Sequence, residues 1–224
     1  MKNCIMIPAY NEANEIGRVV GEVRKQGFPV IVVDDGSSDA TSDIAKGQGA
    51  EVLRNERNQG KGVSLSRGFN YALAKGYDTV IIMDGDGQHD PLDISSFLWA
   101  QENLNCGIII GNRMLQAQSM PRVRYLTNRF MSWLISSLVG QKIPDTQCGF
   151  RLIKKEVLEK ISLKTHNFEI ESEMIIGAAH LGFCIGSIPI KTLYRNEKSQ
   201  INPFIDTLRF IHFIFREVFR NKSS

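Results

Sequence analysis

The sequence lacks several features that would place it in a common functional class. It has no uninterrupted apolar run of the ~18–20 residues that a membrane-spanning helix requires. Its N-terminal apolar stretch is too short for a secretory signal, so we expect a cytoplasmic protein. The net charge of +3 over 224 residues is too small to indicate nucleic-acid binding. The four cysteines form no CxxC pair, and the apolar contexts of Cys4 and Cys184 predict buried free thiols in a reducing compartment.

Two nucleotide-binding signatures are also missing. The GxxxxGK[ST] spacing of a P-loop does not occur, and no GxGxxG follows the first predicted strand, which disfavours a nicotinamide-binding Rossmann domain. Neither an internal repeat nor a low-complexity linker interrupts the chain. A chain of this length with 42% hydrophobic residues therefore predicts one globular domain with a substantial core.

Strand-like and helix-like segments alternate along most of the chain. Strands are predicted at 4–7, 50–55, 79–83, 107–113 and 184–195, with another beginning at 30; helices are predicted at 15–27, 62–76, 93–103, 120–140, 168–182 and from 203 onward. Strands separated by helices imply right-handed crossovers. We therefore expect an α/β fold with a mostly parallel central sheet and helices on both faces.

Polar side chains follow several of these predicted strands. The strands end in PAYNEANE, DDGSSD, DGDGQHD and GNR, in chain order. Because ligands of parallel α/β sheets bind beyond the carboxyl ends of the strands, this edge is the predicted ligand site.

Asp84 and Asp86 are the candidate metal ligands. They follow a very apolar strand one residue apart, and Gln88 can add a neutral oxygen. Such oxygen donors suit Mg²⁺ or Mn²⁺ with positions left open for phosphates. Without a cation, these carboxylates and those of Asp34 and Asp35 would repel one another. The alternative is that the pair only caps a helix beginning near Pro91.

The segment NQGKG (58–62) places glycines and Lys61 at the entrance to a helix. A helix N-terminus offers backbone N–H groups and a favourable dipole to an anion, so this segment is a candidate phosphate site. A glycine-rich turn without a ligand is an equally good interpretation of these five residues.

Taken together and in order, the motifs IPAYNE, VVDDGSSDAT, NQGKG, MDGDGQHDP, GNR, DTQCGFRL and EKSQINP resemble those of inverting family 2 nucleotide-sugar glycosyltransferases of the dolichol-phosphate mannosyltransferase type. The resemblance runs from about residue 3 to about residue 210. It implies a GT-A fold, a divalent cation and a GDP- or UDP-linked sugar donor.

The resemblance also implies roles for individual positions. Asp84, Asp86 and Gln88 match the metal-binding motif, and Arg113 matches an arginine near the phosphates. Together with Lys61 and Gly85, the positions implied to bind the nucleotide are Pro8, Ala9, Tyr10, Asn11, Glu12, Asp34 and Asp35.

The acceptor stays open at this stage. A hydroxyl acceptor would need a general base. The candidate is Glu171, near the start of the helix predicted to end at Gly182. Glu171 could equally be a first-turn glutamate that complements the helix dipole. A polyprenyl phosphate is already an anion and would need arginines more than a carboxylate. Those available are Arg122, Arg124, Arg129 and Arg151.

The preferred prediction is transfer to a polyprenyl (dolichyl or undecaprenyl) phosphate at the inner face of the membrane. The alternatives are a saccharide hydroxyl acceptor, or a non-catalytic nucleotide-sugar-binding or membrane-recruited subunit.

The C-terminal segment 203–224 is predicted to form an amphipathic helix and tail beyond a catalytic domain of residues 1–202. Basic residues lie along one side and apolar residues along the other. That pattern suits peripheral contact with an anionic membrane, docking on a membrane subunit, or simple packing on the domain. One departure from the family pattern is Gln200, which stands where relatives often have a lysine that contacts phosphate.

Overall fold

The computed structural model describes residues 1–115, 120–167 and 169–191 of the chain. In this part a seven-stranded sheet has the order β3-β2-β1-β4-β6-β5-β7. The strands are β1 (Asn3–Ala9), β2 (Val30–Asp34), β3 (Glu51–Arg54), β4 (Thr79–Ile82), β5 (Ile108–Asn112), β6 (Arg151–Lys154) and β7 (Ile185–Pro189). The predicted α/β architecture is confirmed.

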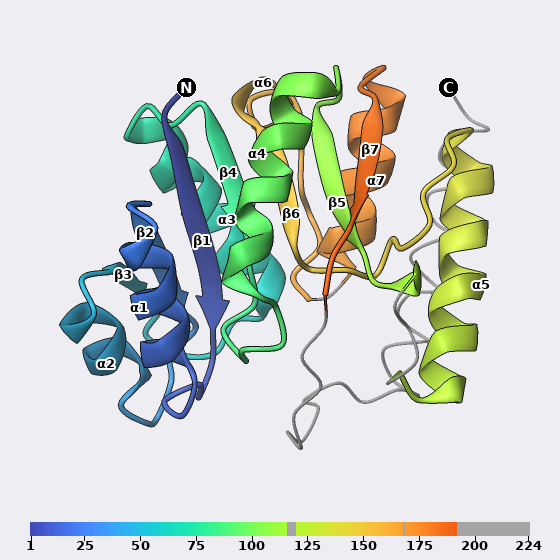
Figure 1. The fold of residues 1–224 in the computed structure, drawn as a ribbon. Coiled ribbons are helices and arrows are strands. Elements are labelled where there is room, and N and C mark those ends of the chain that lie inside the picture. Colours follow the sequence, from blue (N-terminus) through green and yellow to red (C-terminus); the bar gives the residue numbers. More distant parts are fainter. Residues whose placement is uncertain (116–119, 168, 192–224) are drawn as a thin grey trace.

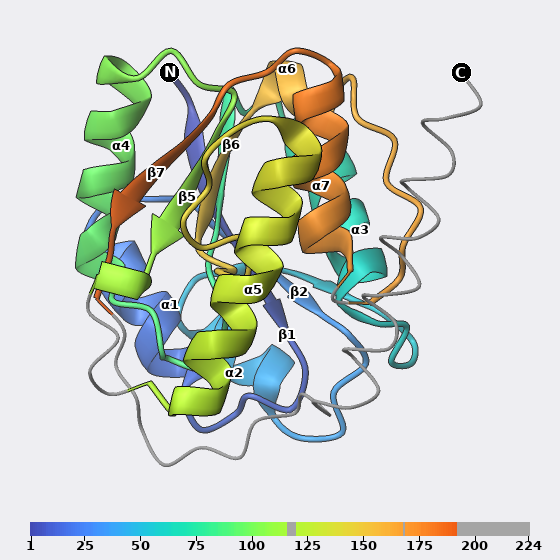
Figure 2. The same cartoon turned by 90° about the vertical axis from the view of Figure 1, so that its right-hand side faces the viewer.

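Helices cover both faces of the sheet. They are α1 (Ile16–Lys25), α2 (Thr41–Gly47), α3 (Lys61–Ala74), the short 3₁₀ helix η1 (Pro91–Asp93), α4 (Ile94–Asn103), α5 (Arg122–Val139), α6 (Lys155–Leu158) and α7 (Ile170–His180). Helices α1 and α4 lie on one face and α3 and α7 on the other, while α5 stands beyond the β5–β7 edge of the sheet, beside α7 (Figures 1 and 2). The central strands are consequently apolar on both sides, and all five residues of β2 are buried.

Strand β6 was not predicted from the sequence. It pairs antiparallel with both β4 and β5 and so separates these two strands in the sheet. Its first residue, Arg151, is level with Ile82 at the carboxyl end of β4. The segment that leads into β6 therefore arrives at the edge where the other strands end, and it adds residues to the predicted site.

The prediction of free cysteines is wrong for one of the two residues named. Cys4 is a buried free thiol, but Cys184 forms a disulfide with Cys106. The two residues precede β7 and β5, which pair in parallel, and the N–H of Gly107 donates to the carbonyl of Cys184 over 2.9 Å. Parallel pairing of distant segments placed these cysteines side by side, which their spacing in the sequence did not reveal.

The predicted C-terminal helix and the end of the segment predicted as a strand at 184–195 lie outside the described residues. The division of the chain at residue 202 therefore stays a prediction. Among the helices of the described ranges, none combines the length and the apolar character needed to cross a membrane.

Candidate active site

A cavity of about 450 Å³ opens at the carboxyl ends of β1, β4 and β5. Of the predicted site residues, those that line it are Pro8, Ala9, Tyr10, Asn11, Glu12, Asp35, Lys61, Asp84, Gly85, Asp86, Gln88, Arg113 and Glu171. Asp34 does not line it. The strand ends thus bring together nearly all of the residues that the sequence motifs indicated.

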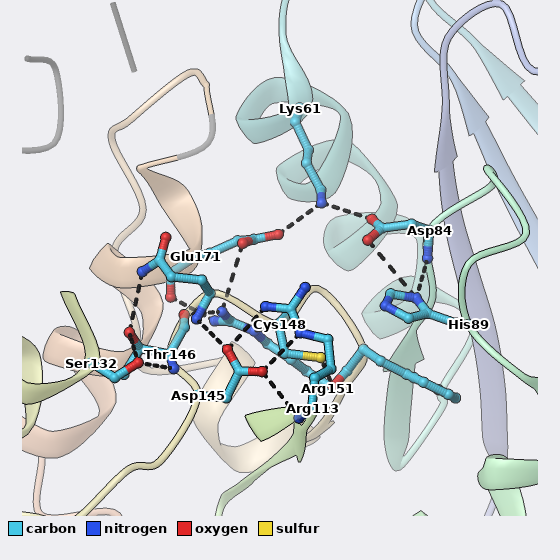
Figure 3. A network of polar contacts seen from close by, with 12 residues as sticks. Lys61, Asp84, His89, Arg113, Ser132, Asp145, Thr146, Cys148, Arg151 and Glu171 are labelled. Atoms are coloured by element: carbon cyan, nitrogen blue, oxygen red, sulfur yellow. Dashed lines mark hydrogen bonds and ion pairs between the residues drawn. The ribbon is translucent and has the colours of Figure 1, made fainter. Parts of the chain in front are cut away.

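Lys61, which lines this cavity, joins two carboxylates (Figure 3). Its Nζ lies 2.7 Å from Oδ1 of Asp84 and 2.7 Å from Oε1 of Glu171. The three residues come from the start of α3, the end of β4 and the first turn of α7. Burial opposes the charged form of Lys61, but the two carboxylates outweigh it and raise the pKa of this ammonium above its ordinary value. Likewise, burial opposes ionisation of Asp84, but the attraction of Lys61 holds the pKa of that carboxyl well below its ordinary value.

His89 supports Asp84 from the other side. Its Nδ1 accepts a hydrogen bond of 3.2 Å from the backbone N–H of Asp84, and its ring packs 5.0 Å from that of Phe150. Burial lowers the pKa of His89 to about 4, so the imidazole is neutral at neutral pH. Its 3.8 Å approach to the Asp84 carboxylate is therefore not an ion pair.

The turn after β4 does not act as a helix cap. Asp90 performs that role, because its Oδ1 accepts a hydrogen bond of 3.0 Å from the N–H of Leu92 at the start of η1. Asp86 accepts one from the N–H of Gln88 over 3.0 Å and stays in the cavity wall. The interpretation of Asp84 and Asp86 as caps is therefore wrong.

The donor atoms of this turn fit a divalent cation that takes most of its ligands from elsewhere. Within the described part of the chain, no three or more His, Cys, Asp or Glu side chains gather as a metal-binding cluster. The oxygen donors that this turn contributes to the cavity wall are two carboxylates, from Asp84 and Asp86, and the amide of Gln88. Such a set is typical of Mg²⁺ and Mn²⁺ sites that are completed by water and substrate phosphates.

Gly149 allows this arrangement, and sequence reasoning assigned it no role. A Cβ atom at Gly149 would lie 2.4 Å from Oδ2 of Asp84. The residue belongs to the segment before β6 and also lines the cavity. Its position in the motif DTQCGF was the available signal, but the antiparallel insertion that brings it against Asp84 was not predicted.

The candidate arginines have different surroundings. Arg113 is buried and forms two hydrogen bonds to Asp145, from Nε to Oδ2 over 2.7 Å and from Nη2 to Oδ1 over 2.9 Å. Arg124 lines the cavity, whereas Arg122 and Arg129 are exposed on α5.

Arg151 is not available to an acceptor, which corrects the prediction. Its guanidinium is buried and donates to the backbone carbonyls of Thr146, Cys148 and Glu171 over 2.8, 2.7 and 2.6 Å. It lies 3.7 Å from the Glu171 carboxylate as well. Arg151 thus fixes the segment before β6 against the first turn of α7.

Asp34 is an internal residue. Its side chain is fully buried, accepts from the N–H of Ser37 over 2.8 Å and from the hydroxyl of Ser42, and lies 3.7 Å from Arg54. The prediction that it contacts the nucleotide has no support in this geometry. Asp35, in contrast, reaches the cavity wall.

Asp35 also organises the loop before α3. It accepts from the N–H groups of Gln59 and Gly60 over 3.0 and 2.8 Å, while the N–H of Gly62 donates to the carbonyl of His166 over 2.8 Å. These three N–H groups, which were predicted to bind an anion, are therefore already hydrogen-bonded to the protein. Asn58, Gly60 and Lys61 of the predicted phosphate site line the cavity, and Lys61 brings the positive charge.

Comparisons with known proteins agree with this geometry. The model of the family described as glycosyl transferase family 2 matches residues 4–162. The chain is 30% identical to a UDP-N-acetylglucosamine–dolichyl-phosphate N-acetylglucosaminyltransferase of Methanococcus voltae, over 85% of each chain. It is 31% identical to an undecaprenyl-phosphate mannosyltransferase of Micrococcus luteus, over 87% of this chain and 85% of that one.

A solved structure has the same fold. Glucosyl-3-phosphoglycerate synthase from Mycobacterium tuberculosis, in complex with Mn²⁺, UDP and phosphoglyceric acid, superposes with a TM-score of 0.72 at 18% identity. The match covers 96% of this chain and 76% of that one.

Proposed function

The chain belongs to glycosyl transferase family 2, and we propose that it transfers a sugar from a nucleotide-diphosphate sugar to a polyprenyl phosphate. Relatives named for transfer to dolichyl and undecaprenyl phosphate support this acceptor. Within the cavity, the observation that supports a phosphate acceptor is the position of the Glu171 carboxylate between two cations.

Glu171 is poorly placed to act as a general base. One of its oxygens holds Lys61 at 2.7 Å and the other lies 3.7 Å from Arg151. Both carboxylate oxygens thus face cations of the protein, and to reach an acceptor hydroxyl the side chain would have to leave these contacts. A hydroxyl acceptor needs proton transfer to a base, but a phosphate acceptor arrives as a nucleophilic anion and does not.

The donor would be held by its diphosphate at the turn after β4. A divalent cation at Asp84 and Asp86 would neutralise part of the charge that develops on the departing nucleoside diphosphate. Lys61 lies in the same wall of the cavity, where it bridges Asp84 and Glu171. Because its ammonium is held in place before the reaction, it offsets the carboxylate charge beside the leaving group without reorganisation.

The acceptor phosphate would be bound by Arg124. This residue comes from α5, lines the cavity and forms no ion pair with a carboxylate of the described ranges, whereas Arg113 is already balanced by Asp145. A polyprenyl phosphate enters from a lipid phase, so we place the reaction at a membrane surface. Attack from the side opposite the diphosphate inverts the anomeric carbon.

Two measurements test this function. Calorimetry with GDP-mannose, UDP-glucose and UDP-N-acetylglucosamine, each with and without Mn²⁺, should give tight, metal-dependent binding of one donor. Transfer of the labelled sugar from that donor should then be detected on a short-chain polyprenyl phosphate and not on a free saccharide. Transfer to the saccharide alone would refute the phosphate acceptor and restore Glu171 as the candidate base.

A further inference from the structure

Helix α5 exposes a row of large apolar side chains. Val123, Leu126, Phe130 and Trp133 are 79%, 63%, 59% and 63% exposed. Their spacing of three, four and three residues places them along one side of the helix, and we call these four residues the α5 stripe. Scattered apolar residues are normal on a protein surface, but a continuous row on one helix indicates an interaction site.

The opposite side of α5 is held to the protein by both polar and apolar contacts. Two of its buried residues, Asn128 and Ser132, are polar, and Ser132 accepts a hydrogen bond of 2.9 Å from the N–H of Thr146. Ser136 similarly accepts from the N–H of Ile143 over 3.0 Å. The same inner side packs Ile135, which is fully buried, together with Met131, Leu134, Leu138 and Val139 against the core, so the helix already has an apolar inner face and the α5 stripe is a second, outward one. Figure 2 shows α5 on the outer side of the molecule.

The chain segment that carries the stripe is positively charged. Residues 114–144 contain four cations and no aspartate or glutamate, and the cations are Arg122, Arg124, Arg129 and Lys142. Arg122, Arg129 and Lys142 are exposed, while Arg124 lines the cavity. A second copy of this surface, or the basic segment 203–224 with four cations and two carboxylates (4 − 2 = +2), would carry the same sign of charge.

We propose that the α5 stripe docks on an anionic lipid surface, with Val123, Leu126, Phe130 and Trp133 at the level of the headgroups and upper acyl chains. Exposed arginines and a tryptophan beside an apolar row are the composition of helices that lie in a membrane interface. This inference rests on the proposed function only for its purpose, which is to bring a lipid-borne phosphate to the enzyme.

The position of α5 joins this surface to the active site. Arg124 on the same helix lines the catalytic cavity. On the inner side, Ser132 contacts Thr146, which is next to the Asp145 that holds Arg113. Docking of the stripe would thus place the cavity wall that carries Arg124 near the lipid headgroups.

Tryptophan fluorescence tests this surface directly. The chain has two tryptophans, and Trp99 on α4 is 61% exposed, nearly as much as Trp133. In a Trp99→Phe background, vesicles of phosphatidylcholine with about 30% phosphatidylglycerol should shift the Trp133 emission to the blue, and brominated lipids should quench it. The vesicles contain no polyprenyl phosphate, so the result does not depend on the proposed reaction.

Sedimentation with the same vesicles measures the affinity. Phe130→Ser with Trp133→Ser should weaken binding at least tenfold, and Arg122→Gln with Arg129→Gln should weaken it roughly fivefold per charge at low salt. The matched control, Trp99→Ser, removes an equally exposed tryptophan elsewhere and should leave binding unchanged. Unchanged thermal unfolding in each variant would show that the fold is kept.

Several outcomes would overturn the proposal. They are absence of vesicle binding, binding that leaves Trp133 unshifted, equal loss of binding in the control, and burial of Trp133 by self-association or by a protein without lipid. Vesicle binding through the stripe without any sugar transfer would refute the proposed function alone. Transfer to a short-chain acceptor without vesicle binding would refute the docking surface alone.

Discussion

Replacing Gly149 with alanine should disable the metal-dependent step of donor binding. In the present geometry the added Cβ would lie 2.4 Å from Oδ2, 3.0 Å from Oδ1 and 3.1 Å from Cγ of Asp84. An ordinary contact begins at 3.4 Å, so the nearest oxygen must move by about 3.4 − 2.4 = 1.0 Å.

The Asp84 carboxylate is the group that will move. The backbone before β6 is fixed, because Cys148 and Phe150 are fully buried and Arg151 holds the carbonyl of Cys148 at 2.7 Å. Metal–ligand distances are tolerant to only ~0.2 Å, and a misplacement of ~1 Å in an active site costs on the order of 10²-fold in rate. We expect overpacking to lower the free energy of unfolding by about 1–3 kcal/mol.

The assay is calorimetry of the donor with and without Mn²⁺, followed by turnover under saturating donor. Gly149→Ala should lose about 10²-fold in Mn²⁺-dependent donor affinity or turnover while the thermal transition stays cooperative. The matched control is Gly177→Ala in α7, where an added Cβ meets no atom within 4 Å and alanine favours the helix. Full metal-dependent affinity and turnover in a folded Gly149→Ala protein would show that Asp84 does not hold the metal in this position.

Three further predictions concern the site and the thiols. Asp86→Ala should abolish the Mn²⁺ dependence of donor binding by calorimetry without altering thermal stability, and retained dependence would contradict the ligand assignment. Glu171→Gln should lower turnover by less than tenfold and leave the pH profile of kcat unchanged, because no base is needed for a phosphate acceptor; a hundredfold loss would favour a hydroxyl acceptor. Burial raises the pKa of Cys4 and of Cys148 to about 12, so at pH 8 neither thiol should react with a thiol reagent until the protein unfolds. Unfolding without reductant should then release two reactive thiols, and four would show that the disulfide is absent.

The sequence was informative wherever the chain follows a repeating strand–helix pattern. Each predicted strand that lies wholly within the described residues is present, and the polar residues at the ends of β1, β4 and β5 meet in one cavity because parallel strands end at a common edge. Strand β6 broke the pattern. Its four residues, RLIK, are too short to show a period, and nothing local indicates that they pair antiparallel between β4 and β5.

The errors at the site follow from that missing strand and from long-range pairing. The segment before β6 carries Gly149 to Asp84, and the carbonyls around it bind Arg151, which the sequence alone left as a candidate to contact the acceptor phosphate. The disulfide between Cys106 and Cys184 likewise depends on the pairing of β5 with β7. In each case the deciding contact joins residues whose proximity depends on the order of strands in the sheet.

The repulsion between carboxylates, which first indicated a metal, is resolved by the protein itself. Asp34 is satisfied by Ser37 and Ser42, and Asp35 by the amide of Asn55 at 2.7 Å and by backbone N–H groups. The charge of Asp84 is met by the ammonium of Lys61. Clustered aspartates therefore do not by themselves require a bound cation. The case for a metal rests instead on Asp86 and Gln88 in the cavity wall, and on a diphosphate that would add negative charge where Lys61 is already shared between two carboxylates.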